Sequence, residues 1–133
     1  MSNLGKKKLK VMIIEDDEDL LCLYRDYLLS QGHDIVSCCL SANNIMVDFE
    51  KFRPDVCLMD YRISGRTNGI DAAMEILAKY PSAPIIFLTA YGPLNEELVK
   101  FPKLRQKNVQ VIFKPVRLSD MENAMVKLVE ENE

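Results

Sequence analysis

The sequence lacks any apolar run long enough to cross a bilayer. Its hydrophobic stretches, such as residues 85–88, are far shorter than the roughly 20 residues that a membrane-spanning helix needs. The N-terminus carries lysines but no apolar stretch of the kind found in a signal peptide. We therefore expect a cytoplasmic protein that does not contact a membrane.

The chain also lacks the residue pattern of a zinc site. It has one histidine and four cysteines, and no two cysteines are spaced as C-x-x-C. We expect Cys22 and Cys57 to be small buried apolar residues. Cys38 and Cys39 should be free thiols that point to opposite faces of a strand. The only histidine, His33, starts a predicted strand, and we interpret it as a surface residue rather than a catalytic base.

Neither a strong excess of positive charge nor a linker is present. A net charge of −3 and a pI near 5.3 argue against a general nucleic-acid binder. The 133 residues suffice for one domain with a single core, and no Gly/Ser-rich segment or repeat interrupts them. We expect residues 1–8 to be a solvated basic arm and residues 9–131 to be the domain.

Short apolar runs predict strands at residues 10–14, 55–59, 85–88 and 109–113, and residues 33–38 predict a second, weaker strand. Such nearly continuous hydrophobicity is typical of parallel strands that are buried on both faces. Apolar residues at helical spacing predict helices near residues 20–30, 41–52, 69–80, 94–101 and 118–131. Ser41 is a candidate cap of the second helix, and Gln31-Gly32 should end the first. Strands that alternate with helices predict a doubly wound α/β domain with helices on both faces of the sheet.

Polar side chains follow four of the five predicted strands. They are Glu15-Asp16-Asp17, Asp60, Thr89 and Lys114-Pro115. In such sheets ligands bind beyond the carboxyl ends of the strands. We therefore expect these side chains to meet at one edge of the sheet, although they are far apart in the chain.

The charges gathered at this edge predict a metal site. Two unit charges about 4 Å apart repel by roughly 4 kcal/mol at an effective dielectric constant near 20. The three carboxylates of Glu15, Asp16 and Asp60 therefore need a counter-charge. Lys114 supplies one positive charge, which leaves a net excess of about two negative charges. A divalent cation fits that excess, and all-oxygen ligands favour Mg²⁺ or Mn²⁺.

The same residues are suited to phosphoryl transfer. Carboxylate nucleophiles form aspartyl-phosphates, and catalysis of phosphoryl transfer is largely positioning and charge neutralisation. We predict that Asp60 attacks the phosphorus while Lys114 and the Thr89 hydroxyl bind phosphoryl oxygens. Backbone N–H groups of residues 61–63 and of Ala90 could donate as well.

Four motifs occur in order: IIEDDEDL, PDVCLMDYRISG, PIIFLTAYG and VIFKP. Over residues 9–131 the chain resembles the receiver domains of two-component response regulators. The resemblance implies a flavodoxin-like receiver fold with five parallel strands in the order 2-1-3-4-5, flanked by five helices. It also implies a cis peptide bond between Lys114 and Pro115.

The resemblance implies a role for each site residue. Asp60 would be the phosphorylated residue, and the phosphoryl group would contact Thr89, Lys114 and Ala90. Glu15 and Asp16 would be the acidic pair, with Asp16 a direct metal ligand. Mg²⁺ or Mn²⁺ would be held by side chains and one backbone carbonyl, from Glu15, Asp16, Asp60 and Arg62.

The implied function is that of a single-domain receiver, and not of a conventional enzyme beyond its own phosphorylation and dephosphorylation. It would take a phosphoryl group from a sensor histidine kinase or a histidine phosphotransfer protein and act on a downstream effector, as a monomer or weak dimer. The sequence leaves open the kinase, the effector and whether the chain is part of a longer regulator.

Two other classes of protein share some of these features. A pseudo-receiver binds partners without phosphorylation, but it usually loses the acceptor or the acidic pair, and both are present here. A phosphatase of the haloacid dehalogenase type also combines Asp, Thr, Lys and Mg²⁺. That class carries its nucleophile on the first strand, whereas the best acceptor here follows the third.

Some residues depart from the receiver pattern. Ser64 stands where many receivers have proline, and the segment between Thr89 and Lys114 is longer than usual and contains Pro102. Val111 occupies the place where most receivers carry a switching Tyr or Phe. Tyr91 is a candidate substitute, or it shields the phosphoryl site. We therefore expect an unconventional output surface.

Overall fold

The computed structural model describes residues 7–41, 43–60, 69–89 and 107–132. Within these ranges the chain forms five strands and four helices, in the order β1 (Lys10–Ile14), α1 (Glu18–Ser30), β2 (Asp34–Cys39), α2 (Ile45–Phe52), β3 (Val56–Asp60), α3 (Gly69–Lys79), β4 (Ile85–Thr89), β5 (Val109–Phe113) and α5 (Leu118–Glu131). The helix predicted at residues 94–101 lies outside the described residues.

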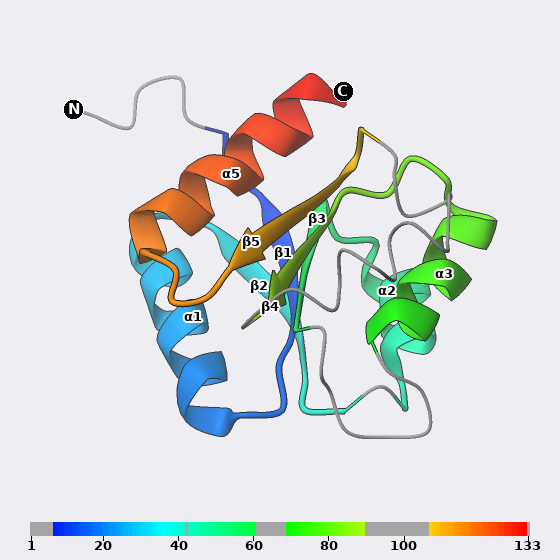
Figure 1. The fold of residues 1–133 in the computed structure, drawn as a ribbon, viewed down its shortest axis with the longest axis horizontal. Helices are drawn as coiled ribbons and strands as arrows, with labels where there is room; N and C mark the ends of the chain where they lie inside the picture. The colour runs from blue at the N-terminus through cyan, green and yellow to red at the C-terminus, as the bar shows by residue number, and fades with distance from the viewer. Residues whose placement is uncertain (1–6, 42, 61–68, 90–106, 133) are drawn as a thin grey trace.

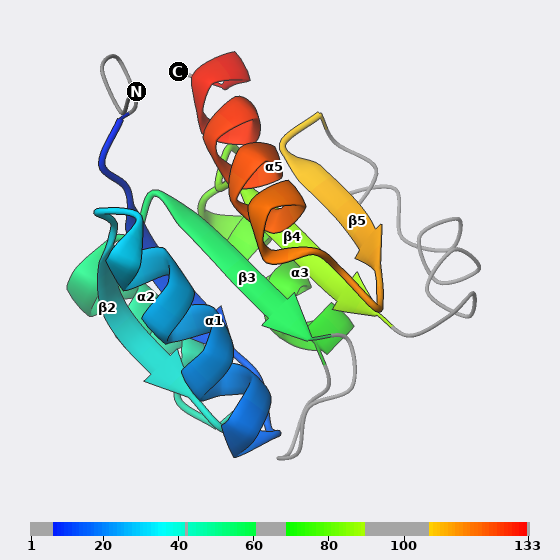
Figure 2. The same ribbon diagram turned by 90° about the vertical axis from the view of Figure 1, so that its left-hand side faces the viewer.

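The five strands form one parallel sheet in the order β2-β1-β3-β4-β5. Figure 1 shows α1 and α5 on one side of the sheet and α2 and α3 on the other. The view in Figure 2 shows α1 and α5 lying across the face of the sheet that is turned toward the viewer. The predicted doubly wound α/β fold and its strand order are therefore confirmed.

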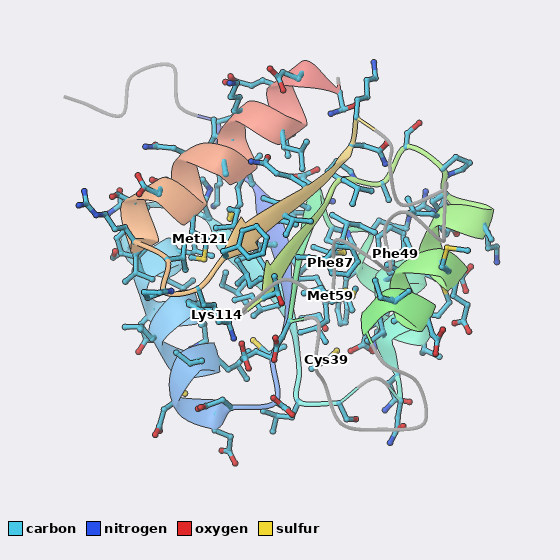
Figure 3. The ribbon with its side chains drawn as sticks, viewed as in Figure 1. Cys39, Phe49, Met59, Phe87, Lys114 and Met121 are labelled. Atoms are coloured by element: carbon cyan, nitrogen blue, oxygen red, sulfur yellow. The ribbon has the colours of Figure 1, made fainter. Side chains whose placement is uncertain are left out.

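The sheet separates two hydrophobic cores because successive side chains of a strand point to opposite faces. The α1–α5 core takes the strand residues Val11, Ile13, Val56, Leu58, Ile86 and Leu88. The α2–α3 core takes the alternate residues Met12, Ile14, Cys57, Met59, Ile85 and Phe87. Figure 3 shows Met59 and Phe87 facing Phe49 of α2, whereas Met121 lies on the α5 side. Both faces of β1, β3 and β4 are thus covered, which explains their nearly uniform hydrophobicity.

Helix α1 begins and ends as its sequence suggests. The carboxylate of Asp17 caps it by accepting the N–H groups of Asp19 and Leu20, at 2.9 and 3.2 Å. Its last turn closes at Gln31, and Gly32 follows with φ of 93°, in the left-handed region that glycine adopts readily.

Helix α2 starts later than predicted. It begins at Ile45 with Asn44 in the cap position, and the prediction of Ser41 as the cap is wrong. The Ser41 hydroxyl instead accepts the N–H of Asn43 at 3.4 Å. Serine readily makes such local bonds to the backbone, and these compete with helix formation.

His33 is buried, so the prediction of a surface histidine is wrong. The residue is 2% exposed, and its Nδ1 accepts the N–H of Leu9 at 3.1 Å. Its Nε2 lies 2.7 Å from Oε2 of Glu122 in α5. With Nδ1 as an acceptor, Nε2 carries the hydrogen and donates it to that carboxylate. The partner lies 89 positions away in the sequence, where local patterns cannot reveal it.

All four cysteines are free thiols. Cys57 is fully buried, and Cys38 is exposed while Cys39 is buried, so the two neighbours do point to opposite faces as predicted. Cys22 is only half-buried, and the prediction that it is a core residue is wrong to that extent. Among the described helices, none has the length and apolar character needed to span a bilayer.

Candidate functional site

Four strands deliver polar residues to one edge of the sheet. Glu15 follows β1, Asp60 ends β3, Thr89 ends β4 and Lys114 follows β5. The strand register aligns these ends, because Ile14 pairs with Met59, Asp60 with Leu88 and Thr89 with Phe113. The structure therefore brings the sequence-predicted residues together, as expected for parallel strands.

Three carboxylates form an acidic cluster at this edge. One oxygen from each of Glu15, Asp16 and Asp60 can be chosen so that all lie within 4.8 Å of one another. The side chains of Glu15 and Asp60 are 2% and 11% exposed, whereas Asp16 is exposed. Lys114 reaches into the cluster, with Nζ 3.3 Å from Glu15 Oε1 and 3.6 Å from Asp60 Oδ1.

The acidic cluster carries more negative charge than Lys114 neutralises. Burial, together with repulsion from the Asp60 carboxylate, raises the pKa of Glu15 to about 7. The Asp17 N–H, which donates to Glu15 Oε2 at 3.2 Å, and the Lys114 ammonium both oppose this rise in pKa but do not cancel it. Glu15 thus keeps its proton at pH values at which an ordinary carboxyl group is ionised, because its surroundings disfavour another anion.

This donor set fits a divalent cation. The ligand atoms are carboxylate oxygens, which suit Mg²⁺ or Mn²⁺ better than zinc. Mg²⁺ keeps several of its waters, so two or three protein oxygens are enough. Asp16 is the most exposed member of the acidic cluster.

Thr89 and Lys114 are held on adjacent strands. The Lys114 N–H donates to the Thr89 carbonyl at 2.7 Å, and Thr89 is 4% exposed. Burial lowers the pKa of Lys114, but the carboxylates of Asp60 and Glu15 more than offset it and raise that pKa overall. The side chain therefore stays a cation beside Asp60. The bond from Lys114 to Pro115 is cis, as predicted.

Three other predicted site residues lie outside the part of the chain that the structure describes. Arg62, Ala90 and Tyr91 lie outside the described residues, so their expected roles remain predictions. Val111, at the expected switch position, is half-buried and packs against the α2–α3 core.

One residue beside the site was not predicted from the sequence. Tyr24 of α1 is 3% exposed and lines a cavity of about 450 Å³ together with Lys114. Burial raises the pKa of its phenol; among the nearby charges Lys114 has the largest effect and lowers that pKa, whereas the carboxylates of Glu15 and Asp60 raise it. The buried face of α1 consists otherwise of leucines, so the polar hydroxyl of Tyr24 was the one feature of the sequence that could have pointed to this residue.

Comparison with known proteins places the chain in a family. The response regulator receiver domain family matches residues 11–126. The regulatory protein LuxO of Vibrio vulnificus is 36% identical over 84 residues, which cover 62% of this chain and 18% of LuxO. The chemotaxis protein CheY of Thermotoga maritima is 24% identical over 125 residues, or 94% of this chain and 98% of CheY. The chain thus spans less than a fifth of the length of the LuxO protein that it matches.

Solved structures agree on the fold. The signal receiver domain of a modulated diguanylate cyclase from Desulfovibrio desulfuricans superimposes with a TM-score of 0.82 at 21% identity, covering 95% of this chain and 97% of that one. The family match covers most of the chain and includes every described residue of the site. The chain therefore belongs to the response regulator receiver domain family, the phospho-accepting modules of two-component signal transduction.

Proposed function

We propose that this protein is a cytoplasmic phosphoryl acceptor in which Asp60 is phosphorylated with the help of Mg²⁺ or Mn²⁺. The donor is the phosphohistidine of a sensor histidine kinase or of a histidine phosphotransfer protein, and a downstream effector protein reads the result. The observation that supports this most is Lys114, which lies between Glu15 and Asp60 inside an acidic cluster.

In the proposed reaction an oxygen of Asp60 forms a bond to the phosphorus of the donor. The phosphorus–nitrogen bond of the phosphohistidine breaks, and its electron pair leaves with the imidazole. Asp60 is suited to attack because it is mostly shielded from water yet remains at the sheet edge. Lys114 and the Thr89 hydroxyl hold two of the phosphoryl oxygens, and the Ala90 N–H is expected to contribute.

The metal would be held by Asp16, Asp60 and the Arg62 carbonyl, with Glu15 beside it, and when bound it neutralises charge on the phosphoryl oxygens. The chain's own chemistry is limited to gaining and losing this one group. Lys114 contributes a fixed positive charge at the place where negative charge accumulates.

The proposal is tested by incubating the protein with acetyl phosphate and Mg²⁺, and separately with candidate kinases, followed by intact-mass measurement. One added phosphoryl group is expected, and Asp60→Asn should abolish it. Asp55→Asn is the matched control: Asp55 lies just before the same strand, at the opposite edge of the sheet, where it accepts the N–H of Lys10 at 2.8 Å.

Undiminished modification of the Asp60→Asn variant would refute the assignment of the acceptor. No modification of the unaltered protein by any of several donors and kinases would favour a pseudo-receiver that binds its partner without phosphorylation.

A further inference from the structure

A pocket of about 420 Å³ lies at the edge of the sheet opposite the acidic cluster. It is formed where α2 and α3 end, beside the amino ends of β3 and β4, and Figure 3 shows Phe49 on this side of the sheet. Small-molecule sites have volumes of roughly 300–1,000 Å³, so the pocket is large enough for a small ligand. We call it the Arg53 pocket, and its lining residues are Phe49, Arg53, Pro54, Lys79, Tyr80, Pro81, Ser82 and Ala83.

The Arg53 pocket is positively charged. Arg53 and Lys79 line it, and none of the described lining residues carries a carboxylate. The Lys79 ammonium is paired with Glu50, which lies outside the lining. Oε2 of Glu50 also accepts the hydroxyl of Tyr80 at 3.1 Å. Lys79 is thus neutralised, whereas Arg53 has no ion pair within the part of the chain that the structure describes.

Tyr80 holds the Arg53 guanidinium in place. The guanidinium carbon lies 4.4 Å from the centroid of the Tyr80 ring, and Nη1 lies 3.5 Å from the Tyr80 hydroxyl. The ring itself packs on Phe49, which is buried, with the two centroids 5.2 Å apart. A guanidinium carries five N–H donors in a planar fork that matches a carboxylate. Stacking on Tyr80 uses the face of this fork and leaves most of its donors for a ligand.

The backbone of Arg53 is of a kind that usually belongs to glycine. Arg53 ends α2 with φ of 47° and ψ of 64°, in the left-handed region. Glycine is common there because it has no Cβ to clash with the backbone. Among the described residues, Arg53 is the only one other than glycine with a positive φ. The side chain is exposed, so the core does not require it. Backbone strain of this kind is found most often at functional positions.

The charge of the Arg53 pocket selects the ligand. One unpaired positive charge matches a carboxylate better than a phosphate group, which carries about −1.5 to −2 charges at pH 7. The rings of Phe49, Pro54 and Pro81 provide apolar surface beside the guanidinium, and the Ser82 hydroxyl is a further donor in the lining. We propose that the Arg53 pocket binds a small organic carboxylate, with its anionic group on Arg53 and an aromatic or aliphatic body against these rings. The proposal does not depend on phosphorylation of Asp60.

The test is an NMR titration of the protein with phenylacetate, which joins a carboxylate to a ring. The amide signals of Tyr80, Ser82 and Ala83 should shift and saturate, with a dissociation constant in the millimolar range because solvent weakens charge pairs at an open site. Phenylacetamide has nearly the same shape without the charge. It should bind about tenfold more weakly, the effect of losing hydrogen bonds to a charged group. Phenyl phosphate should bind no more tightly than phenylacetate.

Two variants of Arg53 test its role in binding. Arg53→Gln removes the charge and should weaken phenylacetate binding about tenfold. Arg53→Lys keeps the charge but removes the planar fork, and it should also weaken binding, by less. Lys51→Gln is the matched control, because Lys51 is exposed in the last turn of the same helix, lies over the Phe52 ring and does not line the Arg53 pocket. It should leave the affinity unchanged.

The absence of saturable shifts with phenylacetate would overturn the proposal. Equal affinity for phenylacetamide would do so too, since the carboxylate would then not be recognised. Equal losses in Arg53→Gln and Lys51→Gln would reduce the effect to general attraction by a basic surface. Tighter binding of phenyl phosphate would overturn the assignment of a carboxylate.

Discussion

Asp16 and Asp17 are neighbours in the sequence but have different surroundings. Asp16 is exposed and belongs to the acidic cluster, whereas Asp17 caps α1. Asp16→Asn should weaken Mg²⁺ binding about tenfold or more, since even partners in the outer shell of a metal site cost that much when lost. Asp17→Asn is the matched control, because asparagine caps helices as well as aspartate does.

The measurement is a Mg²⁺ titration followed by NMR or calorimetry. Equal losses of affinity in the two variants would show that the metal does not lie where the acidic cluster predicts.

Glu15 should make the stability of the metal-free protein depend on pH. Its pKa is about 7 in the folded protein against 4.5 for an ordinary glutamate. Between these values the folded state binds more protons than the unfolded state, so stability falls as pH rises through this window. In EDTA, Glu15→Gln should have a Tm that changes less than that of the unaltered protein between about pH 5 and about pH 8.

Thermal unfolding at several pH values checks this expectation. Glu130→Gln, at an exposed position of α5, controls for the loss of a carboxylate. An identical pH profile for Glu15→Gln and the unaltered protein would mean that Glu15 ionises like an exposed glutamate.

At the scale of helices and strands, the pair formed by His33 and Glu122 joins α5 to the start of β2, and His33 also binds the backbone before β1. Glu122→Ala should destabilise the protein by about 1–3 kcal/mol, because the buried Nε2–H would lose its acceptor. Urea unfolding measures the loss, and Glu130→Ala should cost much less.

A double-mutant cycle with His33→Ala then separates the pair from general packing. If the two losses simply add, the hydrogen bond does not couple these elements.

The sequence allowed the strands and most helices to be predicted because their signals are local. The apolar runs of β1, β3, β4 and β5 and the cap and stop residues of α1 lie within the elements themselves. The start of α2 could not be predicted in this way, because Ser41 bonds to its own loop rather than to the helix. The burial of His33 depends on Glu122, a partner far away in the chain.

The same distinction holds for the candidate site. Asp60, Thr89, Lys114 and the acidic pair could be predicted because parallel strands bring their carboxyl ends to one edge. Tyr24 could not, since its relation to Lys114 depends on how α1 packs across the sheet. The sequence pattern of a single helix predicts which of its faces is buried, but it does not predict which residues of other elements that face contacts.

At the scale of the whole molecule, phosphorylation of Asp60, as proposed, should change one part of the surface more than the rest. Val111 has no ring that could move between exposed and buried positions, and it packs against the α2–α3 core. We predict that a beryllofluoride mimic changes amide hydrogen exchange mainly in residues 91–107, most of which lie outside the described residues, and little at Val111. A switch requires contacts that differ between its two states.

Exchange with and without the mimic, in the presence of Mg²⁺, tests the prediction. Changes confined to α2, with residues 91–107 unaffected, would place the output surface elsewhere.

The unequal exposure of the four thiols offers a route to labelling. Cys38 is exposed, Cys22 is half-buried, and Cys39 and Cys57 are buried. Burial raises the pKa of Cys39 to about 11 and that of Cys57 to about 12, and it also raises the pKa of Cys38. A maleimide reagent needs an accessible thiolate, so it should react first at Cys38. Cys38 precedes Cys39, whose carbonyl accepts the N–H of Glu15 at 2.9 Å. A fluorophore or spin label attached there would sit beside the acidic edge of the sheet and could report donor docking in a chain that has no tryptophan.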